Sequence, residues 1–326
     1  MPPQPDSPLP MPSLKDILLF IPLLGRVVAA ALTRALTLPI TNTAKANRTF
    51  KDIAFAALRA QIAHISIAQE VLLNAKITTE EIYLDFARKP NFRPDTDVLP
   101  AGLKLHRLGP KSAEKTVLYF HEGGYVLACN AGHPRWLSDL QKELAKTKAT
   151  SIVIVAYTLT LTPGGQYPTQ LKQAAESLDW LLNTIGRKSA DIIFAGASAG
   201  GNLTLGLLSH LLHPHPDISK IVLQEPLAAA LLISAWIKFA TTDDSWKRNA
   251  TNIIVKDVLI WGGDKEVIID SIEAMSRTLQ QVHPGTELVV ELDAAREDFI
   301  MDALLGYQGK ATGTKVIEGW LASRLS

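Results

Sequence analysis

A serine flanked by small residues is the feature of this sequence that most clearly suggests chemistry. Ser198 lies within GASAGG, residues 196–201, between the apolar run Asp191–Ala195 and the helix-like segment Gly200–Leu212. A Gly-x-Ser-x-Gly sequence at a strand-to-helix turn presents the serine hydroxyl above the sheet, near a helix N-terminus. This context predicts that Ser198 is a nucleophile, with a Gly-rich turn and an incidental serine as the alternative.

A second Gly-rich turn could serve the same reaction. The sequence HEGGY, residues 121–125, directly follows the apolar run Thr116–Phe120. Backbone N–H groups at such a turn can bind a negatively charged oxygen that develops during a reaction. We therefore predict an oxyanion hole made by the N–H groups of Gly123, Gly124 and Ala199.

The elements that would position these turns follow an alternating pattern. Beyond residue 80, short β-rich runs are separated by segments of helix length, which is typical of an α/β fold. Several runs are continuous and apolar, as expected for parallel strands covered by helices on both faces. The predicted strands are Glu81–Phe86, Leu103–Leu108, Thr116–Phe120, Ser151–Ala156, Asp191–Ala195, Lys220–Gln224, Asp257–Trp261 and Glu287–Leu292. The predicted helices lie near His133–Thr147, Pro168–Ile185, Gly200–Leu212, Glu266–Val282 and Phe299–Tyr307.

The N-terminal segment is apolar without this alternation. Residues 1–12 are rich in proline and contain no basic residue, which argues against a secretory signal. Between residues 14 and 40, the longest uncharged stretch before Arg26 is Ile17–Gly25, and Pro22 interrupts it. Because a membrane-spanning helix needs about 20 apolar residues in a row, we expect a pair of apolar helices packed over a pocket or core. Shallow insertion into a bilayer surface is the alternative.

Composition limits the classes of function. The 326-residue chain is 47% hydrophobic and 20% charged with a net charge of +1, so it can bury a core and shows no basic excess for nucleic acid. The single cysteine, Cys129, excludes an internal disulfide and suits a reducing compartment. The histidines of SHLLHPHP, residues 209–216, have Asp217 as their only acidic neighbour, which favours a solvated loop over a metal site. We expect no metal and no cofactor.

Several ordered motifs resemble the α/β-hydrolases of the hormone-sensitive-lipase type, a family with many fungal and bacterial carboxylesterases. The matching segments are YFHEGGYVL, GHPRWL, AYTLT with PGGQYPTQLKQA, GASAGGNL and WGGDKEVIID. The resemblance implies an α/β-hydrolase fold, with a mostly parallel eight-stranded sheet and helices on both faces. It also implies that residues 1–78 form an N-terminal helical cap and that residues 79–326 form the hydrolase domain.

The resemblance implies further catalytic residues. In this family the serine is followed along the chain by an acid and then by a histidine. The family's acid-x-x-x-Asp spacing matches Glu266 and Asp270, which implies that Glu266 is the acid, with Asp264 as the alternative. After the last strand, where the family has His-Asp-Phe or a close variant, this chain has Glu297 in place of the histidine.

The replacement by Glu297 changes the expected chemistry. Of the eight histidines, only His283 follows Glu266, and a predicted strand of about 20 Å separates it from the serine's end of the sheet. A carboxylate is a much weaker base than imidazole, so we expect the usual acyl-enzyme route to be slow. If Glu297 lies near Glu266, one of the two would stay protonated and act as a general acid, unless Arg296 neutralises the pair.

The pocket is expected to take an apolar small molecule. His121, Tyr125 and Trp236 are candidate substrate contacts, and Phe239 and Trp246 are further candidate walls, with core packing as the alternative for each. The segment Leu227–Asn252 is predicted to hold one apolar helix and a short polar loop, which shortens a region where the family often builds its pocket.

Three functional hypotheses follow. The main one is a non-hydrolytic enzyme of secondary metabolism, which uses the oxyanion donors and a carboxylic acid for cyclisation, elimination or isomerisation. The second is a weak serine carboxylesterase or lipase, in which Glu297 or a water replaces the histidine. The third is a small-molecule receptor, because the family's gibberellin receptors are similar in keeping the serine without the histidine. We expect a cytoplasmic protein, with membrane contact through residues 14–40 and a homodimer as further options.

Overall fold

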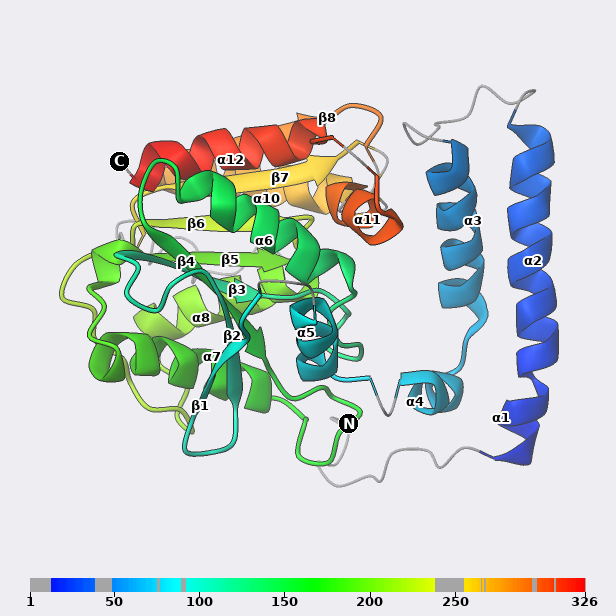
Figure 1. Ribbon diagram of the computed structural model, residues 1–326, viewed down its shortest axis with the longest axis horizontal. Helices are drawn as coiled ribbons and strands as arrows, with labels where there is room; N and C mark the ends of the chain where they lie inside the picture. Colours follow the sequence, from blue (N-terminus) through cyan, green and yellow to red (C-terminus); the bar gives the residue numbers. More distant parts are fainter. Residues whose placement is uncertain are drawn as a thin grey trace. The chain divides into compact units, whose positions relative to one another are not determined.

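The computed structural model describes residues 13–38, 49–74, 77–88, 92–237, 255–264, 266, 268–294, 298–307 and 309–325. The chain divides into two compact units, Met1–Ile77 and Thr78–Ser326. The helices of the first unit and the sheet of the second are labelled in Figure 1. The division falls next to the predicted boundary after residue 78, while the covering role of the first unit stays a prediction.

The second unit is built on an eight-stranded sheet in the order β1-β2-β4-β3-β5-β6-β7-β8. The strands are β1 Asp95–Val98, β2 Lys104–Leu108, β3 Lys115–Phe120, β4 Thr150–Ala156, β5 Ile192–Ala197, β6 Ala229–Ile233, β7 Val258–Gly263 and β8 Thr286–Glu291. Strand β2 pairs antiparallel with β1 and β4, and the other neighbours are parallel. The predicted mostly parallel eight-stranded sheet is confirmed.

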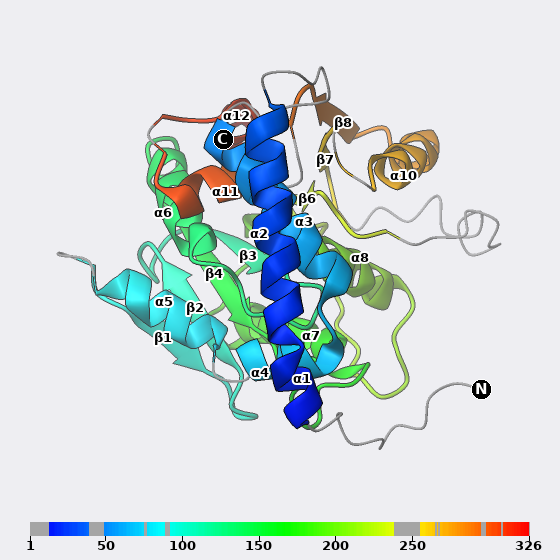
Figure 2. The same ribbon diagram turned by 90° about the vertical axis from the view of Figure 1, so that its right-hand side faces the viewer.

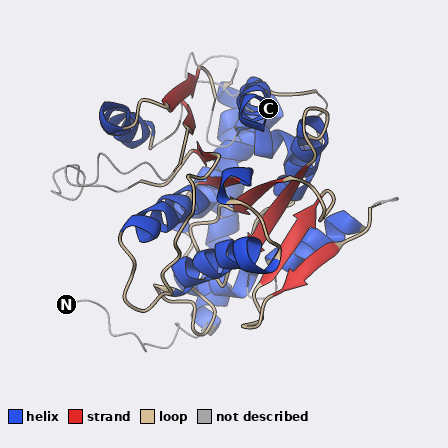
Figure 3. Ribbon diagram, turned by 90° about the vertical axis from the view of Figure 1, so that its left-hand side faces the viewer, coloured by secondary structure: helices blue, strands red, loops and turns tan. Residues whose placement is uncertain are grey.

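Helices cover both faces of the sheet (Figure 3), as predicted. One face carries α7 Thr169–Asp179, α8 Ala199–Leu212 and α10 Ile269–Val282; the other carries α5 Thr79–Ala87, α6 Gly132–Leu144, α11 Asp298–Leu305 and α12 Thr312–Leu325. A π-helical turn, Trp180–Thr184, continues α7, and a 3₁₀ turn, Ser189–Asp191, precedes β5.

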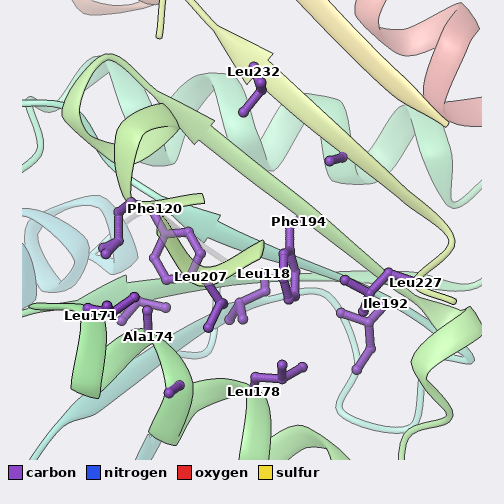
Figure 4. Close-up of a cluster of buried hydrophobic side chains, with 14 of the residues drawn as sticks. Leu118, Phe120, Leu171, Ala174, Leu178, Ile192, Phe194, Leu207, Leu227 and Leu232 are labelled. Atoms are coloured by element: carbon purple, nitrogen blue, oxygen red, sulfur yellow. The ribbon is translucent and has the colours of Figure 1, made fainter. Parts of the chain in front are cut away.

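Alternation along each strand divides the core into two layers. On β3, Leu118 packs with the α7 and α8 side, whereas Tyr119 packs with the α6 side. Figure 4 shows the first layer, where Phe194 of β5 lies among leucines of α7 and α8. Because successive strand residues point to opposite faces, one apolar run such as β3 supplies both layers, which is why these strands read as continuous rather than alternating.

Two of the predicted strands are wrong. Glu81–Phe86 lies within α5, because Thr78 and Glu81 form a capping box in which each side chain accepts the other's backbone N–H. Lys220–Gln224 has no strand, and the sixth strand is Ala229–Ile233, inside the segment predicted to be an apolar helix. A short apolar run that is buried on both faces has no period that separates strand from helix, so β6 was missed.

Among its described residues, the first unit has four helices: α1 Leu14–Leu18, α2 Phe20–Thr37, α3 Thr49–His64 and α4 Ile67–Asn74. Figures 1 and 2 show α2 running beside α3. Pro22 does not interrupt the apolar segment as expected, because it lies in the first turn of α2, where its missing N–H breaks no helical hydrogen bond. The helical segment Leu14–Thr37 has 24 residues, and its most apolar 18-residue window has a mean hydropathy of 1.9, which by length and composition alone is enough to cross a membrane.

Candidate active site

The register of the parallel strands brings the predicted catalytic turns to one edge of the sheet. Phe120, the last residue of β3, pairs with Gly196 of β5, and Ile233 at the end of β6 pairs with Trp261 of β7. Since parallel strands end on the same edge, the turns that follow β3, β5, β6 and β7 lie next to one another. Ser198 follows β5 at the centre of this edge.

Ser198 has a backbone conformation that is unfavourable for a residue with a side chain. Its φ is 53° and its ψ is −115°, at the junction of β5 and α8. The Ser198 N–H donates to the Ile233 carbonyl at 2.9 Å, and the Ser198 carbonyl accepts from the Trp236 N–H at 2.9 Å. These bonds to β6 and the residues after it hold the strained turn in place.

The glycines of GASAGG are required by close packing. A Cβ atom on Gly200 would lie 2.0 Å from the Phe120 carbonyl oxygen and 2.6 Å from that of His121. A Cβ atom on Gly196 would lie 2.2 Å from the Gly200 carbonyl oxygen. The first turn of α8 therefore sits directly against the HEGGY turn, as the prediction of one shared oxyanion site requires.

The two glycines of HEGGY have positive φ angles, which favour glycine. Gly123 has φ 107° and Gly124 has φ 60°, and a Cβ on Gly123 would lie 2.4 Å from the Leu127 carbonyl oxygen. The Gly123 carbonyl accepts the N–H groups of Val126 and Leu127, each at 2.9 Å. The loop with two predicted oxyanion donors thus has a fixed shape beside the turn that carries Ser198 and Ala199.

His121 anchors this loop from a fully buried position. Its Nε2 lies 3.0 Å from the Thr79 hydroxyl, its Nδ1 lies 2.6 Å from the Glu122 carbonyl, and its ring stacks on Tyr157 at 4.2 Å. Burial lowers the pKa of His121 to about 3, so the ring is neutral. The predicted contact of His121 with substrate stays a prediction, since the structure shows the ring supporting the loop.

Tyr125 and Trp236, the other predicted substrate contacts, are joined by a residue that the sequence did not single out. The Tyr125 hydroxyl donates to Asn202 Oδ1 at 2.8 Å, and Asn202 Nδ2 donates to the Trp236 carbonyl at 3.0 Å. Asn202 lies one turn after Ser198 on α8, so the only signal for it was its place in GASAGGNL. The Trp236 side chain is 44% exposed. Tyr125 is half-buried, and burial raises the pKa of its hydroxyl.

The carboxylate of Glu266 is held between the ends of β6 and β7. Its Oε1 accepts the Ser234 hydroxyl at 2.6 Å and the Gly263 N–H at 2.7 Å, and only 6% of the residue is exposed. Asp264, the alternative acid, is half-buried, and its N–H donates to the Glu291 carbonyl at 3.0 Å. Ser234 was missed because its segment was predicted to be helical.

Glu297, the residue in place of the family's histidine, lies outside the described residues, as do Arg296, Phe239 and Trp246. The described chain resumes where α11 begins. This helix lies close to α6, because a Cβ atom added to Gly132 would lie 2.4 Å from the Ile300 carbonyl oxygen. The Glu-for-His replacement therefore rests on the sequence comparison within the family and stays a prediction.

Two further histidines, His283 and His133, are held by other contacts. His283 Nε2 lies 2.9 Å from the carbonyl of Val255, which precedes β7 and so marks the amino end of the strands, opposite to Ser198. His133, at the start of α6, is fully buried with its Nδ1 3.8 Å from Glu122 Oε1. In the part of the chain that the structure describes, no group of three or more His, Cys, Asp or Glu side chains could hold a metal ion.

A cavity of about 340 Å³ lies beside α8. Tyr125 and Asn202 line it, together with Leu171 of α7 and Leu203 and His210 of α8. Its volume lies at the lower end of the range for small-molecule sites. The cavity reaches Tyr125 and Asn202, but its lining also includes the polar side chains of Gln170 and His213 and does not include Ser198.

Comparison with known proteins decides the family. The profile of a family described as alpha/beta hydrolase fold matches residues 117–298, more than half of the chain. The chain belongs to this α/β-hydrolase family. Over 170 residues it is 27% identical to steryl acetyl hydrolase 1 of Saccharomyces cerevisiae, a match that covers 51% of this chain and 35% of that protein.

Solved structures share the fold of this α/β hydrolase. An esterase of the bacterial hormone-sensitive lipase family has a TM-score of 0.57 at 19% identity, over 94% of this chain and 99% of that one. Carboxyl esterase 2 of the mycorrhizal fungus Tuber melanosporum has a TM-score of 0.56 at 19% identity, over 78% and 100%. These similarities show the fold and agree with the predicted resemblance to the hormone-sensitive-lipase type. The non-hydrolytic role that we took as the main reading finds no support in these comparisons, which include a relative named as a hydrolase.

Proposed function

We propose that this α/β hydrolase is a slow serine carboxylesterase that cleaves esters of apolar small molecules. The observation that carries the proposal is the junction of the two turns: Ser198 sits in a strained conformation, and Gly200 fits against Phe120 and His121 only because it lacks a Cβ. A structural turn has no need for this combination. It matches what acyl transfer requires, a presented hydroxyl beside a set of rigid N–H donors.

Each step of the proposed reaction uses a residue of this edge. The Ser198 oxygen attacks the ester carbonyl carbon, and the carbonyl oxygen becomes an oxyanion near the N–H groups of Gly123, Gly124 and Ala199. The C–O bond to the alcohol then breaks, the alcohol leaves with a proton, and an acyl-serine remains. A water molecule attacks this acyl group and restores the serine with release of the acid.

The base that accepts the serine proton sets the rate. Glu266 has the buried, doubly hydrogen-bonded carboxylate expected of an orienting acid, but an orienting acid needs a base to act through. In our proposal Glu297, or a water that it orients, takes that part. Because a carboxylate is a weaker base than imidazole, turnover is slow compared with that of an enzyme with a complete triad.

The proposed substrates are esters with an apolar alcohol or acyl part. The similarity to a protein named steryl acetyl hydrolase supports this class.

The first test asks whether Ser198 is the nucleophile. We expect slow hydrolysis of p-nitrophenyl butyrate and covalent labelling by a fluorophosphonate, and we expect Ser198→Ala to abolish both. Ser323→Ala, an exposed serine on α12, is the matched control and should leave both unchanged. Labelling and turnover that persist in Ser198→Ala would refute the assignment.

The second test concerns Glu297. The change Glu297→His should raise ester turnover by about ten-fold or more, because it supplies the base that the reaction lacks. If this variant reacts with fluorophosphonate faster but its ester turnover is unchanged, hydrolysis of the acyl-serine limits the rate. That result would contradict our proposal that the weak base Glu297 limits turnover.

A non-hydrolytic enzyme is the second candidate, and the observation that favours it is the glutamate at the family's histidine position. In that case Ser198→Ala keeps most of the activity toward the true substrate, whereas Glu297→Gln removes it. A receptor would show no turnover that either substitution changes. Ser198→Ala thus separates the three candidates, because it abolishes turnover in the first, keeps it in the second and has no turnover to change in the third.

A further inference from the structure

The first unit has an apolar surface that its own helices leave uncovered. Large hydrophobic side chains of α1 and α2 are exposed along the whole length of the segment: Leu14, Leu18, Ile21, Val28, Leu32 and Leu36 are 47% to 74% exposed. Their spacing of three, four and seven residues places them on one face of the helix. We call this the outer face of α1 and α2, or the outer face for short.

The opposite side of the same helix packs against α3. Leu23 is buried, and Phe20, Val27 and Arg34 are half-buried on that side. Arg34 donates to the Asp52 carboxylate through both Nε at 2.9 Å and Nη2 at 2.6 Å, and the Asp52 side chain is only 3% exposed. The two helices are therefore fixed side by side, and the outer face points away from their contact.

Charges lie at the border of the outer face and not within it. Lys15 and Arg26 are exposed and separated by 11 residues, about three turns, so they share one flank of the helix. Asp16 is the single acidic residue of α1 and α2, and Ser13 binds its carboxylate on the half-buried side. A long apolar face with basic residues along its flank is suited to a membrane surface, where lysine and arginine reach the headgroups.

The pairing of α2 with α3 decides between two ways of entering a membrane. At 24 residues, Leu14–Thr37 is about 36 Å long, which would suffice to span a bilayer. Spanning would draw α3 into the hydrocarbon with Lys51, Asp52 and Arg59, or it would separate Arg34 from Asp52. Charged side chains at that depth are costly, whereas a helix that lies flat keeps the pair and buries the outer face.

We propose that α1 and α2 lie in the plane of a membrane surface, with the outer face inserted into an anionic lipid leaflet. The proposal adds a lipid partner that ester hydrolysis by itself does not require. It also gives an enzyme for apolar esters access to the phase in which such esters dissolve. The failure of this proposal would leave the assignment of Ser198 intact, because the two are tested on different readouts.

The first experiment measures binding of the full chain to vesicles by flotation. Binding to phosphatidylcholine vesicles should strengthen when phosphatidylglycerol is added and weaken with salt. The double variant Ile21→Glu with Leu32→Glu should bind about ten-fold or more weakly, since it places two carboxylates on the outer face. Val222→Glu is the matched control: Val222 is 72% exposed on the second unit, and its change should not alter binding. All variants should keep the hydrolysis of a soluble ester.

The second experiment measures depth. Nitroxide labels are attached at Leu14→Cys, Val28→Cys and Leu36→Cys, and their depths are compared in the same vesicles. Cys129 is 2% exposed and burial raises its thiol pKa to about 12, so it stays unlabelled. Three equal, shallow depths support the proposal. A deep label at position 28 between two shallow ones shows a spanning helix and overturns it.

Other occupants of the outer face give different results. If a second copy of the chain covers the face, the Ile21→Glu and Leu32→Glu variant turns a dimer into a monomer in sedimentation and leaves flotation unchanged. If the hydrolase unit covers it, the variant changes ester turnover and leaves flotation unchanged. Either result overturns the lipid assignment.

Discussion

The two units of this chain differ in how far they bury their apolar side chains. In the sheet unit, Phe120 and Phe194 are fully buried between the sheet and the helices on one of its faces. In the helical unit, Ile21 and Leu36 are 72% and 74% exposed on one side of α2. The sheet unit therefore completes its own core, whereas the helical unit leaves an apolar face for which water is a poor solvent. The proposed membrane surface would supply an apolar phase for this face of the first unit.

The units also differ in how well their structure should tolerate a substitution. Around Ser198 the backbone of α8 touches the backbone of the HEGGY turn, so no side chain can move aside. Between α2 and α3 the described contact is a helix pair with one buried ion pair. The following predictions test this contrast, in order of decreasing effect.

The largest effect is expected at Gly200. Gly200→Ala places a Cβ 2.0 Å from the Phe120 carbonyl oxygen, so we expect a loss of more than about 3 kcal/mol of stability and at least about a hundred-fold loss of ester turnover. Thermal unfolding and turnover measure the two. Gly206→Ala on the same helix is the control: its nearest neighbour is a Leu171 carbon at 3.7 Å, so the change should stabilise α8 by up to about 1 kcal/mol.

The next largest effect is expected in the helical unit. Asp52→Asn leaves Arg34 without its countercharge, and we expect the α2–α3 pair to lose about 2–3 kcal/mol. Hydrogen exchange of the α2 and α3 amides should speed up while that of β3 and β5 stays slow. In the control Asp85→Asn, the ion pair with Arg88 is exposed and the change should cost less than about 0.5 kcal/mol. Equal acceleration in both units would contradict their independence.

A pH dependence is expected from His121. Burial lowers its pKa from 6.5 to about 3, so between these values the unfolded chain binds a proton that the folded chain does not. Stability therefore falls as the pH drops from 6.5 toward 3, by about 1.4 kcal/mol per pH unit from this residue. His121→Gln should be less stable at pH 7 and should reduce this slope by that amount in denaturant unfolding at several pH values. An unchanged slope would show that His121 protonates in the folded state.

The smallest effect is expected at Asn202. Asn202→Ala removes the bonds that join Tyr125 to the residues after β6, at a cost of about 1 kcal/mol. If Tyr125 and Trp236 contact substrate, the variant should raise KM several-fold with a small change in kcat. An effect confined to thermal stability would instead assign these residues to the core.

Much of the site could be predicted because its residues are close in sequence. GASAGG and HEGGY each form one turn, and the apolar runs that precede them are strands β5 and β3. Because β3 and β5 are parallel neighbours, the turns that follow them lie at the same edge of the sheet. The resemblance predicted Glu266 as the acid from a short motif after a strand, and that strand is present as β7; the role of Glu266 stays a prediction.

The errors have physical causes. Glu81–Phe86 contains Ile, Tyr and Phe, which favour strands, but the capping box at Thr78 starts a helix, and that helix brings Thr79 to the ring of His121. The run AALLI, residues 229–233, is apolar throughout, so nothing in its sequence distinguishes the strand β6 from a buried helix. Pro22 was judged a helix breaker, although its place in the first turn of α2 makes it harmless.

The sequence alone determined the local chemistry: a serine between glycines, a Gly-rich turn after a strand, a carboxylate four residues before an aspartate, and an apolar N-terminal segment. Only the tertiary structure decided which distant residues hold these groups. Ser234 binds Glu266 and Thr79 binds His121, across separations of 32 and 42 residues. Such contacts depend on which strands and helices become neighbours, and that order is set by packing the whole sheet, which no local pattern specifies.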